Sequence, residues 1–192
     1  MKHQLLIEDH FYCHEVVTRL TCNGLTEKIN AISIEYSRTL LSGHTLFWCG
    51  NGGSAADCQH LAAELVGRFK NNRRALKSIA LTTDSSVITS ISNDLSYADI
   101  FSRQLEALGS PNDILVVIST SGNSENIIRV LKTAKQIGVL SVALLGKDGG
   151  EAKNWSDHVL IVPSFCTARI QEMHILIGHI MCDLIEKELD LA

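Results

Sequence analysis

The residues most able to do chemistry follow one another along a glycine-rich turn and the helix that it opens. The turn at residues 50–54 offers backbone N–H groups beside the partially positive amino end of a helix, where anions bind. His60 and Glu64 follow four residues apart and therefore lie on one face of that helix. An anion-binding turn next to an imidazole and a carboxylate predicts a site for a small phosphorylated substrate.

Neither part of this segment identifies the ligand by itself. The Gly-x-Gly-Gly-Ser turn lacks the third glycine of a dinucleotide fingerprint and the acidic residue expected about 20 positions later. No Walker lysine follows, which argues against nucleoside triphosphate hydrolysis. A tight strand-to-helix turn without a ligand is the alternative for residues 50–54. The spacing of His60 and Glu64 suits an acid–base pair or two metal ligands, and the alternative is an ordinary pair of surface residues.

A second polar loop follows an aliphatic segment in the middle of the chain. Residues 119–124 read Ser-Thr-Ser-Gly-Asn-Ser and lie between the run 114–118, which is typical of a buried strand, and a predicted helix. Hydroxyl groups together with helix N–H groups can bind the oxygens of a phosphate without a buried lysine. The alternative is a helix cap with spare serines, but a cap needs only one hydroxyl.

The C-terminal helix carries polar residues on an otherwise apolar segment, namely Gln171, Glu172, His174 and His179. Gln171 and His179 are eight residues apart, which is about 80° around the helix axis and ~12 Å along it. A histidine in such a helix is commonly a hydrogen-bonded core residue. Spacing alone does not show whether this helix meets His60 and Glu64.

Alternating strands and helices predict the elements that must position these residues. The expected helices are a pair within 4–42, ended by Gly43, then 54–66 with Ser54 as its cap, 84–91, 97–108, a helix from the serine loop to about 137, and 168–188. The expected strands are 45–49, 78–81, 114–118, 140–145 and 158–162. Residues 92–94 read as a turn and 67–77 as a polar loop.

This order predicts an α/β fold, a three-layer sandwich in which helices flank a central parallel sheet and an N-terminal helical extension precedes it. No repeat or linker divides residues 1–192, so a single domain is expected. Ligands bind such sheets at the carboxyl ends of the strands, and both polar loops occupy that position.

Composition excludes several other classes of protein. The chain has 192 residues, 45% of them hydrophobic and 20% charged, with a net charge of −4, which favours a globular protein without a nucleic-acid surface. No charged leader with an apolar core and no apolar run of ~20 residues is seen, so no membrane partner is expected. Six cysteines without a C-x-x-C pair predict reduced thiols and a cytoplasmic location.

A local basic cluster lies in the polar loop 67–77. It consists of Arg68, Lys70, Arg73, Arg74 and Lys77. A solvated loop or a contact between subunits is the first interpretation, and a role in binding the substrate phosphate is the second.

Several motifs together resemble those of the bacterial phosphoheptose isomerases, which are sugar isomerase (SIS) domain proteins. The resemblance covers about residues 44–188 and rests on the segments 49–68, Asn93-Asp94, 118–124, 146–150 and 168–179. It implies a flavodoxin-like SIS fold and an aldose–ketose isomerase that converts sedoheptulose 7-phosphate to D-glycero-D-manno-heptose 7-phosphate. That reaction begins ADP-heptose synthesis for the lipopolysaccharide core.

The resemblance also implies roles for individual residues. The zinc ligands of the family fall on His60, Glu64, Gln171 and His179, the catalytic base on Glu64 and the catalytic acid on His179. The phosphate-binding residues fall on Ser119, Thr120, Ser121 and Ser124. The remaining substrate-binding candidates are Asn51, Gly52, Gly53, Ser54, Glu64, Asn93, Asp94 and Gln171. No nucleotide cofactor is implied, and the family forms homotetramers with sites between subunits, for which residues 1–42 are the expected contact.

The residues fit this chemistry independently of the resemblance. Aldose–ketose exchange moves a proton between adjacent carbons through an enediol, which needs a carboxylate base, a group that shuttles oxygen protons and a fixed phosphate. The ~12 Å between Gln171 and His179 requires long side chains or two subunits for one zinc ion. Two non-catalytic alternatives are an SIS protein that binds the replication initiator, whose known examples lack the counterparts of Glu64 and His179, and a sugar-phosphate sensor.

Overall fold

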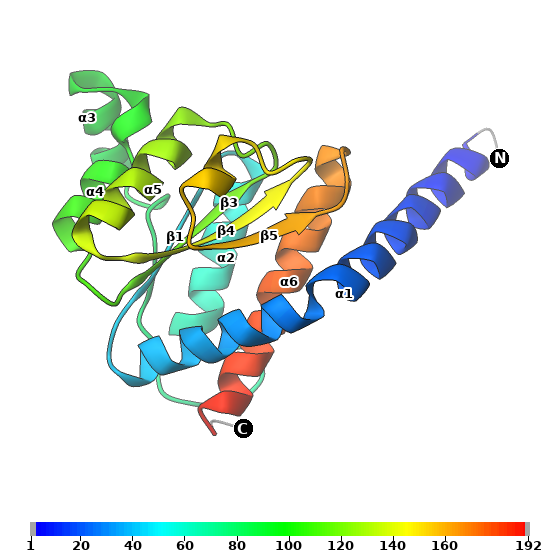
Figure 1. Cartoon of the computed structure of the whole chain (residues 1–192), viewed down its shortest axis with the longest axis horizontal. Helices are drawn as coiled ribbons and strands as arrows, with labels where there is room; N and C mark the ends of the chain where they lie inside the picture. Colours follow the sequence, from blue (N-terminus) through cyan, green and yellow to red (C-terminus); the bar gives the residue numbers. More distant parts are fainter. Residues whose placement is uncertain (1–2, 191–192) are drawn as a thin grey trace.

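The computed structural model describes residues 3–190 and shows a five-stranded parallel sheet between two layers of helices (Figure 1). The strand order is β2-β1-β3-β4-β5. The strands are β1 (Leu46–Gly50), β2 (Ser78–Ala80), β3 (Ile114–Ser119), β4 (Leu140–Gly146) and β5 (His158–Val162). The predicted α/β sandwich is confirmed, and each predicted strand lies within one residue of its observed bounds.

Helices cover both faces of the sheet because alternate strand residues point to opposite sides. The helices are α1 (Gln4–Leu41), α2 (Gly53–Val66), α3 (Ser85–Asp94), α4 (Ser102–Leu108), α5 (Glu125–Ile137) and α6 (Thr167–Glu188). Trp48 and Val116 join the core beneath α1, α2 and α6. Phe47 and Val117 join the second core, beneath α4 and α5. The strands are thus buried on both faces, as a parallel sheet requires.

The N-terminal segment is one helix of 38 residues, so the predicted helical pair is wrong. The buried positions of its second half, from Val17 through Leu25 and Ile32 to Leu40, follow one helical stripe without a change of phase. Gly24 lies on the exposed side of this part of the helix, where a single glycine weakens a helix without ending it. The amino-terminal half projects beyond the sheet and its helices (Figure 1).

Two other boundaries differ from the sequence predictions. Gly52, with φ of +57°, precedes the first residue of α2, whereas the predicted cap Ser54 is buried within the first turn. The predicted turn at 92–94 is the last turn of α3, since the helical hydrogen bonds continue to Leu95 N, which donates to the Ile91 carbonyl at 3.0 Å. The predicted helix 97–108 is a short 3-10 turn, η1 (Tyr97–Asp99), followed by α4.

A second 3-10 turn, η2 (Glu151–Asn154), lies between β4 and β5. Within residues 3–190, none of the helices has the length and apolar character needed to pass through a lipid bilayer. The first two and the last two residues of the predicted single domain lie outside the described part of the chain.

Candidate active site

The glycine turn and the serine loop lie side by side at the carboxyl ends of β1 and β3. Gly50 pairs with Ile118 in the register of the two strands, so the residues that follow each strand are neighbours. Asn51 Nδ2 donates to Asn126 Oδ1 at 2.9 Å, and Asn126 Nδ2 donates back to Asn51 Oδ1 at 2.8 Å. Tyr97 Oη also donates to Asn51 Oδ1 at 3.0 Å. We call residues 50–54 and 119–124 together the loop edge.

Some hydroxyl groups of the serine loop form hydrogen bonds within the loop, and the Ser124 hydroxyl does not cap the helix that follows. Ser119 Oγ accepts from Gly122 N at 3.0 Å, and Ser121 Oγ accepts from Asn123 N at 3.3 Å. Ser124 occupies the position that precedes α5, but its side chain makes no capping hydrogen bond. The serine loop thus ends at the amino end of a 13-residue helix, whose first N–H groups are available to an anion.

The shape of the serine loop depends on close backbone contacts with residues 146–150. Gly122 has φ of +67°, and a side chain there would collide with the carbonyl group of Gly149. The Gly122 carbonyl accepts from Ala152 N at 2.8 Å, and Asn123 Oδ1 accepts from Glu151 N at 2.9 Å. The glycines of residues 146–150 thus support the serine loop from its outer side.

His60, Glu64 and His179 come together where α2 and α6 pack against each other. His60 Nε2 lies 2.9 Å from His179 Nε2 and 3.3 Å from Glu64 Oε1. A close helix contact makes this possible, because a Cβ atom on Gly178 would collide with Leu61. The convergence of the two helices was not visible from spacing. We call these three residues the helix-face cluster.

The helix-face cluster is partly open to solvent. The exposed fraction of the side chain is 48% for His60 and 21% for Glu64. Asp57, one turn before His60, was missed as a site residue. Partial burial raises the pKa of its carboxyl, while His60 and His179 lower it. The net shift of the Asp57 pKa is upward, so the effect of burial outweighs that of the two imidazoles.

The donor set of the helix-face cluster fits a zinc ion. Two imidazole nitrogens and a carboxylate oxygen lie within 4.8 Å of one another. Ligand atoms ~2.1 Å from a tetrahedral zinc ion are about 3.4 Å apart, which is close to the 3.3 Å between His60 and Glu64 and longer than the 2.9 Å between the two histidines. A fourth position would be left for the remaining ligand or a substrate oxygen.

Gln171, the fourth predicted ligand, lies elsewhere within this subunit. Its amide packs against Gly53, where a Cβ atom would come 2.6 Å from Nε2. Gly53 and His60 are seven residues apart on α2, which is about 10 Å along the helix. Gln171 thus lies at the glycine turn, among the predicted substrate-binding residues.

Asn93 and Asp94 lie at the exposed carboxyl end of α3, where Asn93 Nδ2 donates to Asp94 Oδ1 at 2.8 Å. The hydrogen bond of Tyr97 to Asn51 holds the segment just after them beside the loop edge. Tyr97 and Asn126 were missed in the sequence, since neither belongs to a motif of polar loop residues.

His174 is a fully buried residue that contacts the sheet, as the core interpretation predicts. Its Nε2 lies 3.0 Å from the carbonyl oxygen of Leu145, while Nδ1 has no hydrogen-bond partner among residues 3–190. Burial lowers the pKa of His174 to about 4, although the hydrogen bond to Leu145 opposes this. The side chain is therefore neutral near pH 7.

The basic cluster of residues 68–77 is not uniformly solvated. Arg73 is buried and pairs with Glu186 of α6 at 3.0 Å, with side-chain exposures of 1% and 0%. The other four basic residues of the cluster are exposed. Arg73 therefore departs from both interpretations, because its guanidinium is part of the fold.

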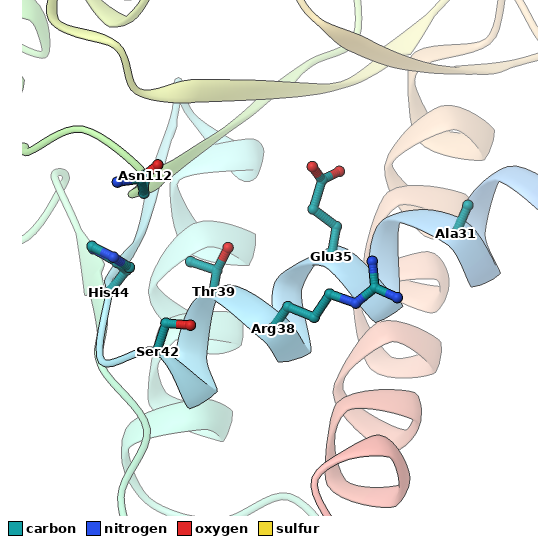
Figure 2. Close-up of a pocket in the computed structure, with 7 residues that line it drawn as sticks. All are labelled: Ala31, Glu35, Arg38, Thr39, Ser42, His44 and Asn112. Carbon is teal, nitrogen blue, oxygen red and sulfur yellow. The ribbon is translucent and has the colours of Figure 1, made fainter.

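A cavity of about 500 Å³ lies away from the loop edge. Figure 2 shows Glu35 and Arg38 of α1 on one side of it and His44 and Asn112 on the other. His44 and Asn112 precede β1 and β3, so this hollow is at the amino ends of the strands. None of the predicted site residues lines it.

Comparisons with known proteins agree with the geometry. The model of the SIS domain matches residues 12–146. A phosphoheptose isomerase of Clostridium acetobutylicum is 60% identical over 147 residues, which cover 77% of this chain and 75% of the relative. A phosphoheptose isomerase of Helicobacter pylori (strain P12) is 47% identical over 182 residues, 95% of each chain.

Solved structures extend the likeness to the whole fold. The phosphoheptose isomerase of Neisseria gonorrhoeae matches with a TM-score of 0.91 and 41% identity, covering 96% of this chain and 98% of that one. The phosphoheptose isomerase of Francisella tularensis matches with a TM-score of 0.94 and 36% identity, covering 97% and 100%. The chain belongs to the SIS domain family and, within it, to the phosphoheptose isomerases.

Proposed function

We propose that the protein interconverts sedoheptulose 7-phosphate and D-glycero-D-manno-heptose 7-phosphate. The observation that carries this proposal is the position of Glu64, 3.3 Å from His60 and within 4.8 Å of the His179 ring nitrogen, on the helix α2 that starts at the loop edge. A carboxylate, a proton-shuttling imidazole and an anion-binding loop are the three parts that an enediol reaction needs.

Binding of the phosphate is assigned to the loop edge. Ser119, Thr120, Ser121 and Ser124 supply hydroxyl groups, and α5 supplies N–H groups at its amino end. The remaining substrate contacts are assigned to the residues that line or adjoin the glycine turn. They are Asn51, Gly52, Gly53, Ser54, Asn93, Asp94 and Gln171. Holding the phosphate fixes the distance from the charged end of the sugar to its first two carbons.

The helix-face cluster moves the protons. The Glu64 carboxylate takes a proton from C1 of the ketose, and His179 gives a proton to the oxygen on C2, which leaves an enediol. His179 then takes the proton from the oxygen on C1, and Glu64 returns its proton to C2. The net change moves two hydrogens within one molecule, so no oxidant or reductant is consumed.

We also propose that one zinc ion per subunit is held by His60, Glu64 and His179, with Gln171 as the fourth ligand. The ligand atoms of the first three residues support this, and Gln171 of another subunit would satisfy the fourth position. Zinc would polarise a sugar oxygen as a Lewis acid. Elemental analysis of protein purified without chelators tests the proposal, and a metal-free preparation with full activity would contradict it.

A homotetramer is the proposed assembly, with residues 1–42 as a contact between subunits. The projecting half of α1 supports it, because Leu5, Ile7, Phe11 and Tyr12 are more than half exposed there. A soluble chain rarely leaves such an apolar surface uncovered. Sedimentation equilibrium of the full chain would test this, and a monomer at micromolar concentration would contradict it.

The proposed location is the cytoplasm, and the proposed pathway is ADP-heptose synthesis for the lipopolysaccharide core. All six cysteines are free thiols, which is typical of a reducing compartment.

The replication-initiator-binding and sensor alternatives are not favoured, because Glu64 and His179 are both present and adjacent to His60.

One assay with several substrates tests the function. Purified protein is incubated with sedoheptulose 7-phosphate and, separately, with a six-carbon and a five-carbon ketose phosphate, and the aldose product is followed by NMR. We expect the seven-carbon substrate to react with the highest kcat/KM. Binding of all three sugars without turnover would instead support the sensor.

A further inference from the structure

A segment outside the predicted site lies directly on the helix-face cluster. Residues 67–73 connect α2 to the approach of β2 and contain no helix or strand. Phe69, in this segment, stacks on the ring of His179, with ring centroids 5.6 Å apart and ring planes 20° apart. The same histidine contacts His60 through Nε2 at 2.9 Å.

Glu186 of α6 holds this segment in place. Its carboxylate accepts from the backbone N–H groups of Phe69, Lys70 and Asn71 at 3.1, 3.2 and 3.2 Å. Asn71 Nδ2 donates to it as well, at 3.2 Å. These hydrogen bonds lower the pKa of Glu186 against the opposing effect of burial. A charged carboxylate thus fixes the backbone of Phe69.

Arg73 joins the same carboxylate to the end of α2. It donates through Nε to Glu186 at 3.0 Å, and through its terminal nitrogens to the carbonyl oxygens of Glu64 and Leu65, each at 2.8 Å. A helix leaves its last carbonyl groups without partners, and a cation there also favours the helix dipole. We call Arg73 and Glu186 the buried clamp.

The buried clamp connects both halves of the proposed acid–base pair. Glu64 lies on the turn of α2 whose carbonyl groups Arg73 binds, and His179 lies two turns before Glu186 on α6. The second side-chain torsion of histidine has a broad energy minimum, so the backbone alone does not fix the direction of the ring nitrogens. A stacked aromatic ring removes that freedom.

We infer that Phe69, held by the buried clamp, is a positioning residue that fixes the ring of His179 for proton transfer. The inference rests on the proposed isomerase function. Phe69 contacts the proposed proton shuttle and follows the carboxyl end of α2, opposite to the glycine turn, so its loss should slow turnover without weakening substrate binding.

The decisive variant is Phe69→Leu, which keeps an apolar side chain and leaves the buried clamp intact. We expect kcat to fall about tenfold while KM stays within about twofold of wild type. Phe69→Tyr restores an aromatic face and should recover most of kcat. A purely structural role would not distinguish leucine from tyrosine in this way.

Two further measurements link the kinetics to the ring. In protein with isotope-labelled histidine, assigned by loss of one signal in His179→Gln, the His179 ring signals should shift in Phe69→Leu and not in Phe69→Tyr. Arg73→Lys should lower kcat as Phe69→Leu does. Arg103→Lys is its matched control, because the Arg103–Glu106 pair is exposed and lies on α4, which covers the other face of the sheet from α6.

The outcomes separate the inference from the function. An inactive wild-type protein would reject the proposed function. An active wild type whose kcat survives Phe69→Leu would overturn the inference, and so would a tyrosine variant as slow as the leucine variant. A kcat of Arg73→Lys equal to that of wild type would overturn the role of the buried clamp.

Discussion

The loop edge and the helix-face cluster differ in their chemical groups and in the roles that we propose for them. The loop edge uses hydroxyl and backbone N–H groups, which carry no formal charge, and its shape depends on glycines such as Gly122. The helix-face cluster uses the ionisable side chains of His60, Glu64 and His179, held by helix packing and a buried ion pair. Binding and proton transfer are therefore assigned to separate elements, and their contributions to KM and kcat should separate.

The largest expected effect comes from Glu64→Gln, which breaks the helix-face cluster alone. The amide keeps the size of the side chain but accepts no proton, so kcat should fall by about 10²–10⁴-fold with little change in phosphosugar affinity. Steady-state kinetics and calorimetric titration measure the two quantities. A near-normal kcat would remove Glu64 as the base.

The opposite result is expected from Ser119→Ala combined with Ser124→Ala, which breaks the loop edge alone. Each lost hydrogen bond to a charged phosphate costs about 1.5–3 kcal/mol, so KM should rise at least tenfold while kcat changes less. Ser156→Ala is a matched control, since its hydroxyl donates to the carbonyl of Ala152. An unchanged KM would place the phosphate elsewhere.

The next prediction concerns the stability of the fold around His174. This residue lies on α6, which carries His179 of the helix-face cluster and Gln171 beside the loop edge. Its pKa is lowered from 6.5 to about 4, so the unfolded chain takes up the proton at a higher pH than the folded protein. The contribution of the neutral His174 to the free energy of unfolding is therefore fully present above about pH 6.5 and is lost as the pH falls toward 4. Between pH 7.5 and pH 5, wild type should lose about 2 kcal/mol more than His174→Gln.

Urea unfolding of both proteins at the two pH values measures this difference. Equal losses in wild type and His174→Gln would show that the buried histidine does not control the pH dependence. The comparison with the variant is needed because the pKa values of Glu172 and Glu186 are also lowered, so their contributions to the free energy of unfolding are likewise lost as the pH falls.

The smallest expected effect is that of Tyr97→Phe, which removes one exposed hydrogen bond to Asn51. A single neutral hydrogen bond is worth about 1 kcal/mol, so KM should rise less than tenfold and kcat should stay constant. A fall in kcat with constant KM would show that the two regions are not independent.

The sequence predicted most of the fold because its signals are local. The aliphatic run of β3 and the alternation of strands with helices are visible without any knowledge of contacts. The predicted break in α1 failed because the buried stripe from Val17 to Leu40 is produced by packing against α6 and the sheet. The turn predicted at 92–94 failed because Asp84 caps a helix that includes those polar residues.

The site was predictable only in part. The loop residues form contiguous motifs, whereas His60 and His179 approach each other although they are 119 positions apart in the chain. Phe69 and Glu186 belong to no sequence motif, and Arg73 was interpreted only as part of the basic cluster, because the stacking and the ion pair form only once α2 and α6 are packed together. The separation of Gln171 from His60 followed from helix geometry, which already placed Gln171 ~12 Å from His179.

Isomerisation in deuterated water tests the central claim most directly. Wild-type protein should incorporate deuterium at C2 of the aldose when sedoheptulose 7-phosphate is the substrate, because a carboxylate exchanges its proton with solvent before returning it to carbon. Glu64→Gln should bind the sugar and incorporate none. Incorporation by Glu64→Gln at the wild-type rate would contradict the assignment of proton transfer to that carboxylate.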